Sequence, residues 1–309
     1  MAKMLLANPR GCCAGVDRAI AVVDELLDEH GGPVYVRKEI VHNREVVERL
    51  RERGAVFVEE VDEAPQGSIL VFSAHGISPA VRQMAKDRKL RVIDATCPLV
   101  SKVHYEAIKF AKAGLHVLLI GHADHDEVIG TMGEIPGRIS LVEDVESVDS
   151  VVVPDPERVA VITQTTLSVD ETREIMEAVR RRFPNVKTPA RDDICYATQN
   201  RQDAVRALAP DVDVLLVVGS QNSSNSLRLG ELSEQLGTRA YLVDHADQVQ
   251  PQWVQGAGRV GITAGASSPE YLTQAIVERV KRLGSYEIVE VGKPEPEIVF
   301  TMPREISLI

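Results

Sequence analysis

Residues 10–15 read RGCCAG, and the second cysteine of this stretch begins a pattern that recurs twice along the chain. When the sequence is aligned on its cysteines, the same order of apolar and polar segments follows Cys13, Cys97 and Cys195. A helical apolar stripe comes first, and an apolar strand run begins 21, 20 and 19 residues after the cysteine, at Val34, Val117 and Val214. This internal repeat determines the predicted fold more than any single motif does.

A polar cluster ends the strand run in each copy. It contains His42, His125 or Ser223, which lie 29, 28 and 28 residues after the respective cysteine. A helix, a short strand, a further apolar strand and a closing helix follow. The closing helices are expected to start at Ser78-Pro79, Ser168 and Ser268-Pro269, because serine caps helices and proline is tolerated in the first turn.

Strands that alternate with helices at this spacing predict an α/β fold with mainly parallel sheets covered on both faces. Three such units related by a pseudo-threefold axis would bring the cysteines and the polar loops to one centre. The periodicity leaves open a serial array of Rossmann-like domains without a common centre. The predicted units are residues 14–96, 97–193 and 194–283, with 1–13 as an N-terminal strand and 284–309 as a tail packing on the core.

The composition indicates a soluble protein of a reducing compartment, which predicts the cytoplasm. The 309 residues carry a formal net charge of −11, which argues against a nucleic-acid surface. No apolar run reaches the ~20 residues of a membrane span, and the short apolar run near the start predicts no secretory signal. Four cysteines in a chain of this length do not form a disulfide scaffold.

One cysteine is commonly a small buried hydrophobic residue, but three at equivalent positions of a repeat point to a metal. Thiolates from separate loops could hold zinc or an iron–sulfur cluster. Closely paired zinc ligands are absent apart from the adjacent pair. A four-iron cluster held by three thiolates would leave one iron open to a substrate oxygen. Of the adjacent pair, Cys13 is expected to be the ligand, because it lies at the turn before the helix predicted to begin near Val16, and Cys12 is expected to point away.

The polar clusters contain mostly neutral hydrogen-bond donors at helix starts, which suit a phosphate or a diphosphate. Glu127 is the carboxylate among them that could deliver a proton to a leaving hydroxyl group. His122 and His125, spaced i and i+3, could instead bind zinc.

A set of motifs in order resembles the 4-hydroxy-3-methylbut-2-enyl diphosphate reductase family, the LytB/IspH type that ends the non-mevalonate isoprenoid route. The resemblance extends from about residue 4 to the tail. The motifs are ANPRGCCAGVDRAI, VHNREVVERL, SAHG, DATCPLV, GHADHDEVIGTMGE, TQTTLSVDET, DDICYAT, GSQNSSNS and TAGASSP.

The resemblance implies a monomer of three pseudo-threefold related α/β units around a central [4Fe-4S] cluster held by Cys13, Cys97 and Cys195. The implied reaction is a two-electron, two-proton reductive dehydroxylation that yields isopentenyl diphosphate and dimethylallyl diphosphate. Because the chain contains no Walker or G-x-G-x-x-G nucleotide motif, electrons are expected from a carrier protein, ferredoxin or flavodoxin in this family.

The resemblance also implies roles for the polar residues. Thr165 and Glu127 would contact the substrate hydroxyl, and Glu127 would supply protons. The diphosphate would be held by His42, His75, His125, Ser223, Ser224, Asn225 and Ser267. The family carries an aromatic residue where this chain has Cys12, which affects local packing rather than the ligand.

Two other functions remain open at this point. A zinc hydrolase of a phosphorylated metabolite would use His122, His125 and a cysteine, and it would be colourless. An iron–sulfur sensor would bind a cluster without turning over a substrate, and would leave the polar groups at the strand ends without a ligand.

Overall fold

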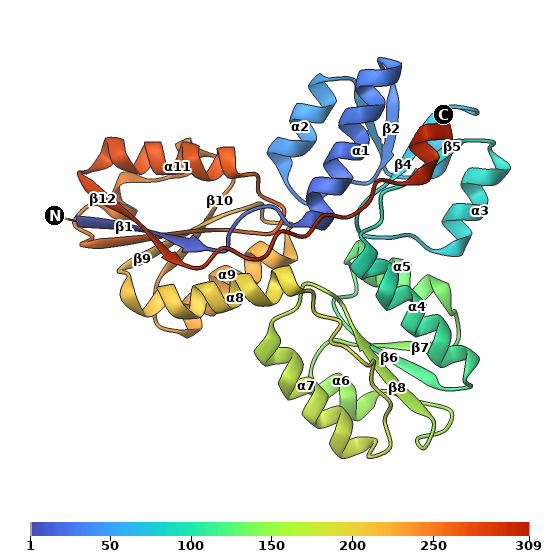
Figure 1. Ribbon diagram of the computed structural model, residues 1–309. Coiled ribbons are helices and arrows are strands. Elements are labelled where there is room, and N and C mark those ends of the chain that lie inside the picture. The colour runs from blue at the N-terminus through green and yellow to red at the C-terminus, as the bar shows by residue number, and fades with distance from the viewer. Residues whose placement is uncertain (1, 309) are drawn as a thin grey trace. The chain divides into compact units, whose positions relative to one another are not determined.

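The computed structural model describes residues 2–308, which form three β-sheets flanked by helices (Figure 1). Every strand pair in the described sheets is parallel. The prediction of an α/β fold with mainly parallel sheets is therefore confirmed, and the three sheets fit the three expected repeat copies. The chain divides into two compact units: residues up to 17, 42–47 and 196–299 form the first unit, and 18–41, 48–195 and those from 300 on form the second.

The second unit contains two of the sheets. The strand order of the first sheet is β3-β2-β4-β5. Its strands are β2 (Val34–Arg37), β3 (Ala55–Val58), β4 (Ile69–Phe72) and β5 (Arg91–Asp94), and the helices along this part of the chain are α1 (Ala14–His30), α2 (Arg44–Glu52) and α3 (Pro79–Asp87), with a 3₁₀ turn η1 (Val61–Glu63). Helices α1 and α2 each begin in the first unit and continue into the second.

The other sheet of the second unit has the order β7-β6-β8, and a single bridge between Ala160 and Lys187 continues it beyond β8. Its strands are β6 (His116–Ile120), β7 (Ile139–Val142) and β8 (Val159–Thr163), and its helices are α4 (Pro98–Lys112), α5 (Asp126–Glu134), α6 (Val145–Ser150) and α7 (Val169–Arg182). Apolar residues of α4 and α5 cover one face, and those of α6 and α7 cover the other.

The sheet of the first unit has the order β10-β9-β11-β1-β12, so the first and last strands of the chain are neighbours. Its strands are β1 (Ala2–Asn8), β9 (Val214–Val218), β10 (Ala240–Val243), β11 (Arg259–Ala264) and β12 (Tyr286–Gly292), and its helices are α8 (Tyr196–Leu208), α9 (Ser224–Gln235), α10 (Pro251–Val254) and α11 (Glu270–Leu283). Three 3₁₀ turns complete the chain: η2 (Ala209–Asp211), η3 (Ala246–Gln248) and η4 (Arg304–Leu308).

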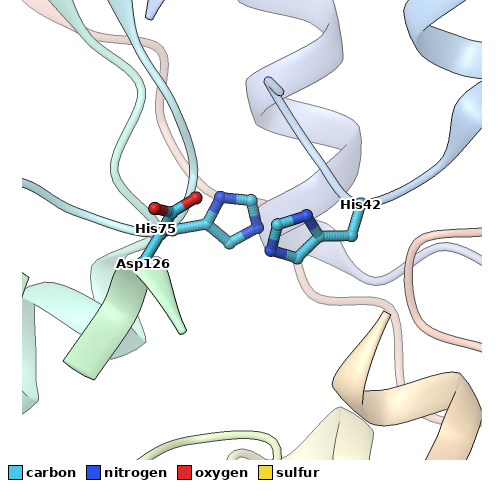
Figure 2. Close-up of side chains that lie close together, drawn as sticks. All are labelled: His42, His75 and Asp126. Carbon is cyan, nitrogen blue, oxygen red and sulfur yellow. The ribbon is translucent and has the colours of Figure 1, made fainter. Parts of the chain in front are cut away.

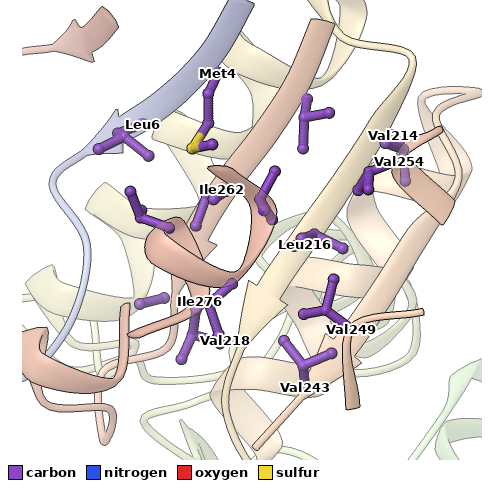
Figure 3. Packing of buried hydrophobic residues seen from close by; sticks show 14 of the residues in the cluster. Met4, Leu6, Val214, Leu216, Val218, Val243, Val249, Val254, Ile262 and Ile276 are labelled. Atoms are coloured by element: carbon purple, nitrogen blue, oxygen red, sulfur yellow. The ribbon is translucent and has the colours of Figure 1, made fainter. Parts of the chain in front are cut away.

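The core of this sheet shows why its strands read as continuous apolar runs. All five residues of β9 are buried, since helices cover both faces of the sheet. Figure 3 shows Leu216 and Val218 of β9 among Ile262 of β11 and Ile276 of α11. Residues of α8 and α9 pack on the opposite face, as Figure 1 also shows.

The sheets share one plan, which confirms the repeat. In each sheet a central strand (β2, β6 or β9) lies between a short edge strand and the next apolar strand (β4, β8 or β11). The fourth position is taken by β5, by the bridge at Lys187, or by β1. The domain boundaries proposed above stay a prediction.

Two of the three expected helix starts are confirmed. Ser78 caps α3 by accepting from the Val81 N–H, and Ser168 caps α7 by accepting from the Glu171 N–H. The third is wrong, because α11 begins at Glu270 and its N-cap is Pro269. The Ser268 hydroxyl is fully buried and donates to the Val218 carbonyl at 2.9 Å, so it is not available for capping.

Candidate active site

The polar residues singled out in the sequence all follow the carboxyl ends of parallel strands, where α/β proteins bind ligands. His42, His125 and Ser223 lie between a central strand and the helix after it, α2, α5 or α9. His75, Thr165 and Ser267 lie two or three residues beyond the ends of β4, β8 and β11. Glu127 lies in the first turn of α5, and Ser224 and Asn225 open α9.

The three cysteines occupy equivalent positions in the backbone. Each immediately precedes a helix, since α1, α4 and α8 begin at Ala14, Pro98 and Tyr196. Each donates its backbone N–H, at 3.0 Å, to a carbonyl two residues past a strand end: Cys13 to Ala266, Cys97 to Ala74 and Cys195 to Thr165. A thiol at a helix start is polarised towards thiolate, the form that binds metals. This donor set of three soft thiolates fits an iron–sulfur cluster.

The neighbouring cysteines differ in what surrounds their sulfurs. Burial raises the pKa of Cys13, but the backbone N–H groups of Val16 and Gly15 and the charge of Arg201 oppose that rise. Burial raises the pKa of Cys12 well above its ordinary value, and the Asp17 carboxylate, to which the Cys12 thiol is hydrogen-bonded, raises it further. Cys13 is therefore the better thiolate, which supports the predicted choice between the two.

Glu127 is held inside the second unit by Thr165. Its carboxylate is 2% exposed and accepts from the Thr165 N–H and the Thr165 hydroxyl, both at 2.8 Å. Burial raises the pKa of Glu127 to about 7; the bonds from Thr165 oppose this rise, and the nearby Asp193 carboxylate adds to it. At neutral pH this carboxyl group is poised between its acid and its base form.

His125 lies beside Glu127, and His75 lies beside His125. His125 caps α5, and its Nδ1 accepts from the Glu127 N–H at 3.2 Å. The rings of His75 and His125 are perpendicular, with centroids 5.9 Å apart. Nitrogen of His75 and carboxylate oxygen of Asp126 lie within 4.8 Å, and both side chains appear in Figure 2. His75, His125, Asp126, Glu127 and Thr165 are called the acid cluster below.

The loop that carries His75 is packed against α4. Gly76 has φ +84°, and a Cβ there would lie 3.0 Å from Nε2 of His104. His104 is buried and bonds through Nδ1 to Glu134 of α5 at 2.9 Å. Glycine is therefore needed at position 76 both for its backbone conformation and for the close approach of the imidazole. Sequence reasoning missed His104, which no motif marks.

In the first unit a set of hydroxyl groups is linked by short bonds. The Ser267 hydroxyl donates to the His42 carbonyl at 2.9 Å and lies 3.3 Å from the Ser223 hydroxyl. Ser226 donates to Ser223 at 3.0 Å. Except for His42, these residues and Asn225 are buried. His42, Ser223, Asn225, Ser226 and Ser267 are called the hydroxyl cluster below.

Asn225 connects this cluster to the loop of the first cysteine. Its side-chain oxygen accepts from the Ala266 N–H at 2.8 Å, and its amide nitrogen donates to Thr198 at 3.4 Å. Ala266 in turn accepts from the Cys13 N–H. The side chain of Asn225 therefore supports the backbone that fixes Cys13.

Asp193 and Lys102 were also missed. Asp193 is buried two residues before Cys195, and it accepts from Lys102 at 2.8 Å and from the Thr163 N–H at 3.0 Å. Burial raises its pKa, which Lys102 opposes. An aspartate also precedes Cys97, at Asp94, and the recurrence of an acid shortly before the cysteine could have drawn attention to Asp193.

A zinc site on His122 and His125 receives no support. Among the described residues, no group of three potential ligands within 4.8 Å of one another contains either of these two histidines. Nδ1 of His125 accepts a backbone N–H as a helix cap.

The helices of the described part include none that is long and apolar enough to cross a membrane.

Comparison with known proteins gives a consistent result. The sequence model of the family described as "LytB protein" matches residues 4–281. The chain is 56% identical to the 4-hydroxy-3-methylbut-2-enyl diphosphate reductase of Hahella chejuensis, over 99% of this chain and 98% of that one. It is 54% identical to the reductase of the same name from Aeromonas hydrophila, over 99% of both chains.

Solved structures of reductases also match. The E-1-hydroxy-2-methyl-but-2-enyl-4-diphosphate reductase of Plasmodium falciparum matches with a TM-score of 0.95 at 38% identity, over 99% of this chain and 97% of that chain. A structure described as (E)-4-hydroxy-3-methyl-but-2-enyl diphosphate reductase, the terminal enzyme of the non-mevalonate pathway, matches with a TM-score of 0.66 at 35% identity, over 91% and 100% of the two chains.

Proposed function

Because the chain belongs to the LytB family, we propose that its cysteine loops and polar clusters carry out the reaction of that family. The chain reduces 4-hydroxy-3-methylbut-2-enyl diphosphate, the last step of the non-mevalonate isoprenoid route. Two electrons and two protons are taken up, the C–O bond to the hydroxyl group breaks, and water leaves. The expected products are isopentenyl diphosphate and dimethylallyl diphosphate.

The proposed cofactor is one [4Fe-4S] cluster per chain with Cys13, Cys97 and Cys195 as ligands. When bound, such a cluster supplies the electrons and an open iron for the substrate hydroxyl. The support lies in the matching backbone positions of the three cysteines, each before a helix and each with its N–H on a strand-end carbonyl.

The observation that carries the proposal is the double role of Thr165. Its N–H and hydroxyl hold the Glu127 carboxylate, and its carbonyl accepts from the Cys195 N–H. One residue thus joins a proposed ligand loop to a buried acid whose pKa is raised to about 7. We assign Glu127 the role of delivering the proton with which the hydroxyl leaves as water, and Thr165 that of orienting it.

The diphosphate is proposed to bind the donors in the loops after the strand ends and at the helix starts. In the acid cluster these are His75 and His125. In the hydroxyl cluster they are Ser223, Ser267 and the amide of Asn225, together with Ser224 and the imidazole of His42. Hydroxyl and imidazole N–H groups at helix N-termini suit an anion, because the positive end of the helix dipole adds to their bonds.

An electron-carrier protein, ferredoxin or flavodoxin, is the proposed source of electrons. The cytoplasm is the proposed location, because the ligand thiols must stay reduced. The monomeric state implied by the resemblance stays a prediction.

Anaerobic turnover tests the whole proposal. Purified protein is assayed with 4-hydroxy-3-methylbut-2-enyl diphosphate and dithionite, and iron, sulfide and zinc are counted per chain. Both isoprenoid diphosphates should form, in proportion to a content of four irons. A colourless, zinc-containing protein that releases phosphate would be a hydrolase. A protein that binds an iron–sulfur cluster but does not turn over the substrate would be an iron–sulfur sensor.

A further inference from the structure

Arg201 is the largest fully buried side chain of the described residues, with no exposed surface. It lies on α8, and the charge of its guanidinium group is never removed at physiological pH. Enclosing such a group is unfavourable by several kcal/mol unless its donors and its charge are matched. The buried guanidinium group must therefore have partners for its donors and for its charge.

All three nitrogens of the group are engaged. Nε and Nη2 donate to the Gly11 carbonyl at 2.9 and 2.6 Å, and Nη2 also donates to the Cys12 carbonyl at 3.3 Å. Nη1 donates to Ala197 at 3.0 Å. Glu295 supplies the opposite charge, at 3.0 Å from Nη2 and 3.4 Å from Nη1.

These bonds hold one side of the loop that ends in Cys13. Gly11 has φ +78°, and a Cβ there would lie 3.2 Å from the Ser268 carbonyl. On the other side of the loop, the Gly11 N–H donates to the carbonyl of Ala264, the last residue of β11, and the Cys13 N–H donates to the carbonyl of Ala266. The loop is thus fixed between β11 and α8.

A second residue of α8 acts on the same loop. The Tyr196 hydroxyl accepts from the Ala14 N–H, the first residue after Cys13. With Arg201 it brackets the cysteine along the chain, at residues 11, 12 and 14.

Glu295 belongs to the tail that follows β12. It forms an ion pair with Arg201, and it also accepts from Asn200 at 3.0 Å. Its side chain is 18% exposed, so water reaches this end of the pair. The tail therefore contributes the charge that makes the burial of Arg201 tolerable.

We propose that Arg201 is a positioning residue for Cys13, and that Glu295 of the tail keeps Arg201 in place. The guanidinium group fixes the carbonyls of residues 11 and 12, so that the Cys13 thiolate points in one direction and can hold its iron. This inference rests on the proposed function in that Cys13 is taken to be a cluster ligand.

The test uses the full chain with Arg201→Met, Arg201→Lys and Glu295→Gln. Arg206→Met is the matched control, because Arg206 lies on the same helix and pairs with Asp203 one turn away. Circular dichroism and thermal melting establish that each variant is folded. Hydrogen exchange of the Gly11 and Cys13 amides is then measured on metal-free protein, and iron content and midpoint potential on reconstituted protein.

Arg201→Met should speed exchange of both amides by about tenfold or more, since the bonds lost are to a charged donor. It should also bind less iron and shift the midpoint potential. Arg201→Lys should lie between it and wild type, because an ammonium group reaches fewer carbonyls. Glu295→Gln should show a smaller effect, and Arg206→Met should show none.

Exchange in folded Arg201→Met within twofold of wild type, with an unchanged potential, overturns the inference. If Arg201→Met does not fold, Arg201→Lys and Glu295→Gln decide: unchanged exchange in both overturns the inference, and faster exchange in either supports it. Wild-type protein that takes up no cluster refutes the proposed function instead, while the exchange rates still report whether Arg201 fixes the loop.

Discussion

The hydroxyl cluster of the first unit and the acid cluster of the second stand at the same place in the repeat but differ in chemistry. The hydroxyl cluster contains serines, an asparagine and one histidine, and no carboxylate. The acid cluster contains two carboxylates, one of them Glu127 with its pKa raised to about 7. Loops with the same position after a strand therefore carry neutral hydrogen-bond donors in the hydroxyl cluster and a titrating carboxyl group in the acid cluster.

The difference separates binding from proton transfer. Neutral donors keep their hydrogen bonds to a diphosphate over a wide pH range, since nothing in a serine or an asparagine titrates near neutrality. A buried carboxyl group exchanges protons but repels an anion when ionised. Under the proposed function we expect Glu127 to govern the rate, and the hydroxyl cluster, together with His75 and His125, to govern the affinity for the diphosphate.

The largest effect is expected at the cysteines, on which both clusters depend. Cys13→Ser should abolish binding of the iron–sulfur cluster and all measurable turnover, because a serine hydroxyl is not a thiolate ligand at neutral pH. Cys12→Ser is the control and should retain most of both. Visible spectra and iron counts after anaerobic purification decide, and the reverse pattern would mean that Cys12 is the ligand.

Glu127→Gln should lower kcat by about 100- to 1,000-fold, because the amide keeps the shape but supplies no proton. Substrate affinity, measured by isothermal titration under anaerobic conditions, should stay within a few-fold of wild type. Turnover close to wild type would break the comparison, since the acid cluster would then have no part in proton delivery.

The pH profile sharpens the same division. Glu127 can donate only as the acid, and its pKa is raised to about 7, so kcat should fall about tenfold per pH unit above that value. The residual activity of Glu127→Gln should not show this fall in kcat at high pH.

The raised pKa of Glu127 also affects stability. Its carboxyl group stabilises the fold below its ordinary pKa of 4.5, and this contribution is lost as the pH rises to about 7. Urea unfolding at pH 5 and pH 8 should show a smaller difference for the variant.

The smallest effect is expected from Ser267→Ala in the hydroxyl cluster. Loss of one donor to an anion should raise KM about tenfold and leave kcat within a few-fold. Ser268→Ala is the neighbouring control: its hydroxyl bonds to Val218 in the core, so it should lower the melting temperature without changing KM. A change in kcat alone for Ser267→Ala would place proton transfer in the hydroxyl cluster as well.

Much of the fold followed from local sequence. The runs beginning at Val34, His116 and Val214 became β2, β6 and β9, because their lengths and apolar residues suit strands buried on both faces. The start of α11 did not follow, since Ser268 had a buried acceptor in Val218 that no local pattern shows. The place of β1 was hidden too: its partners lie more than 250 residues away, as Met4 pairs with Val260 and Ile288.

The site was predictable to the same extent. Repeat spacing marked His42, His125 and Ser223, and the structure places them in the same kind of loop. The supporting residues were not marked. Arg201 and His104 act through partners far away along the chain, Gly11 and Gly76, and only tertiary packing brings them together. From the sequence alone, a charged residue such as Arg201 within a helix is expected to lie on the solvent-exposed face, because its buried acceptors are not visible in the local pattern.

Strand β1 lies between β11 and β12, and Cys13 lies five residues after its end at Asn8. Translation therefore produces Cys13 well before the two strands, β11 and β12, that pair with β1. At about 5–20 residues per second, roughly 15 to 60 seconds separate Ala2 from its partner Tyr286. During most of that time β1 has neither of its strand partners. If Cys13 is a cluster ligand as proposed, its loop gains its backbone partners Ala264 and Ala266 only after β11 has been made, so iron uptake at Cys13 is expected to follow translation.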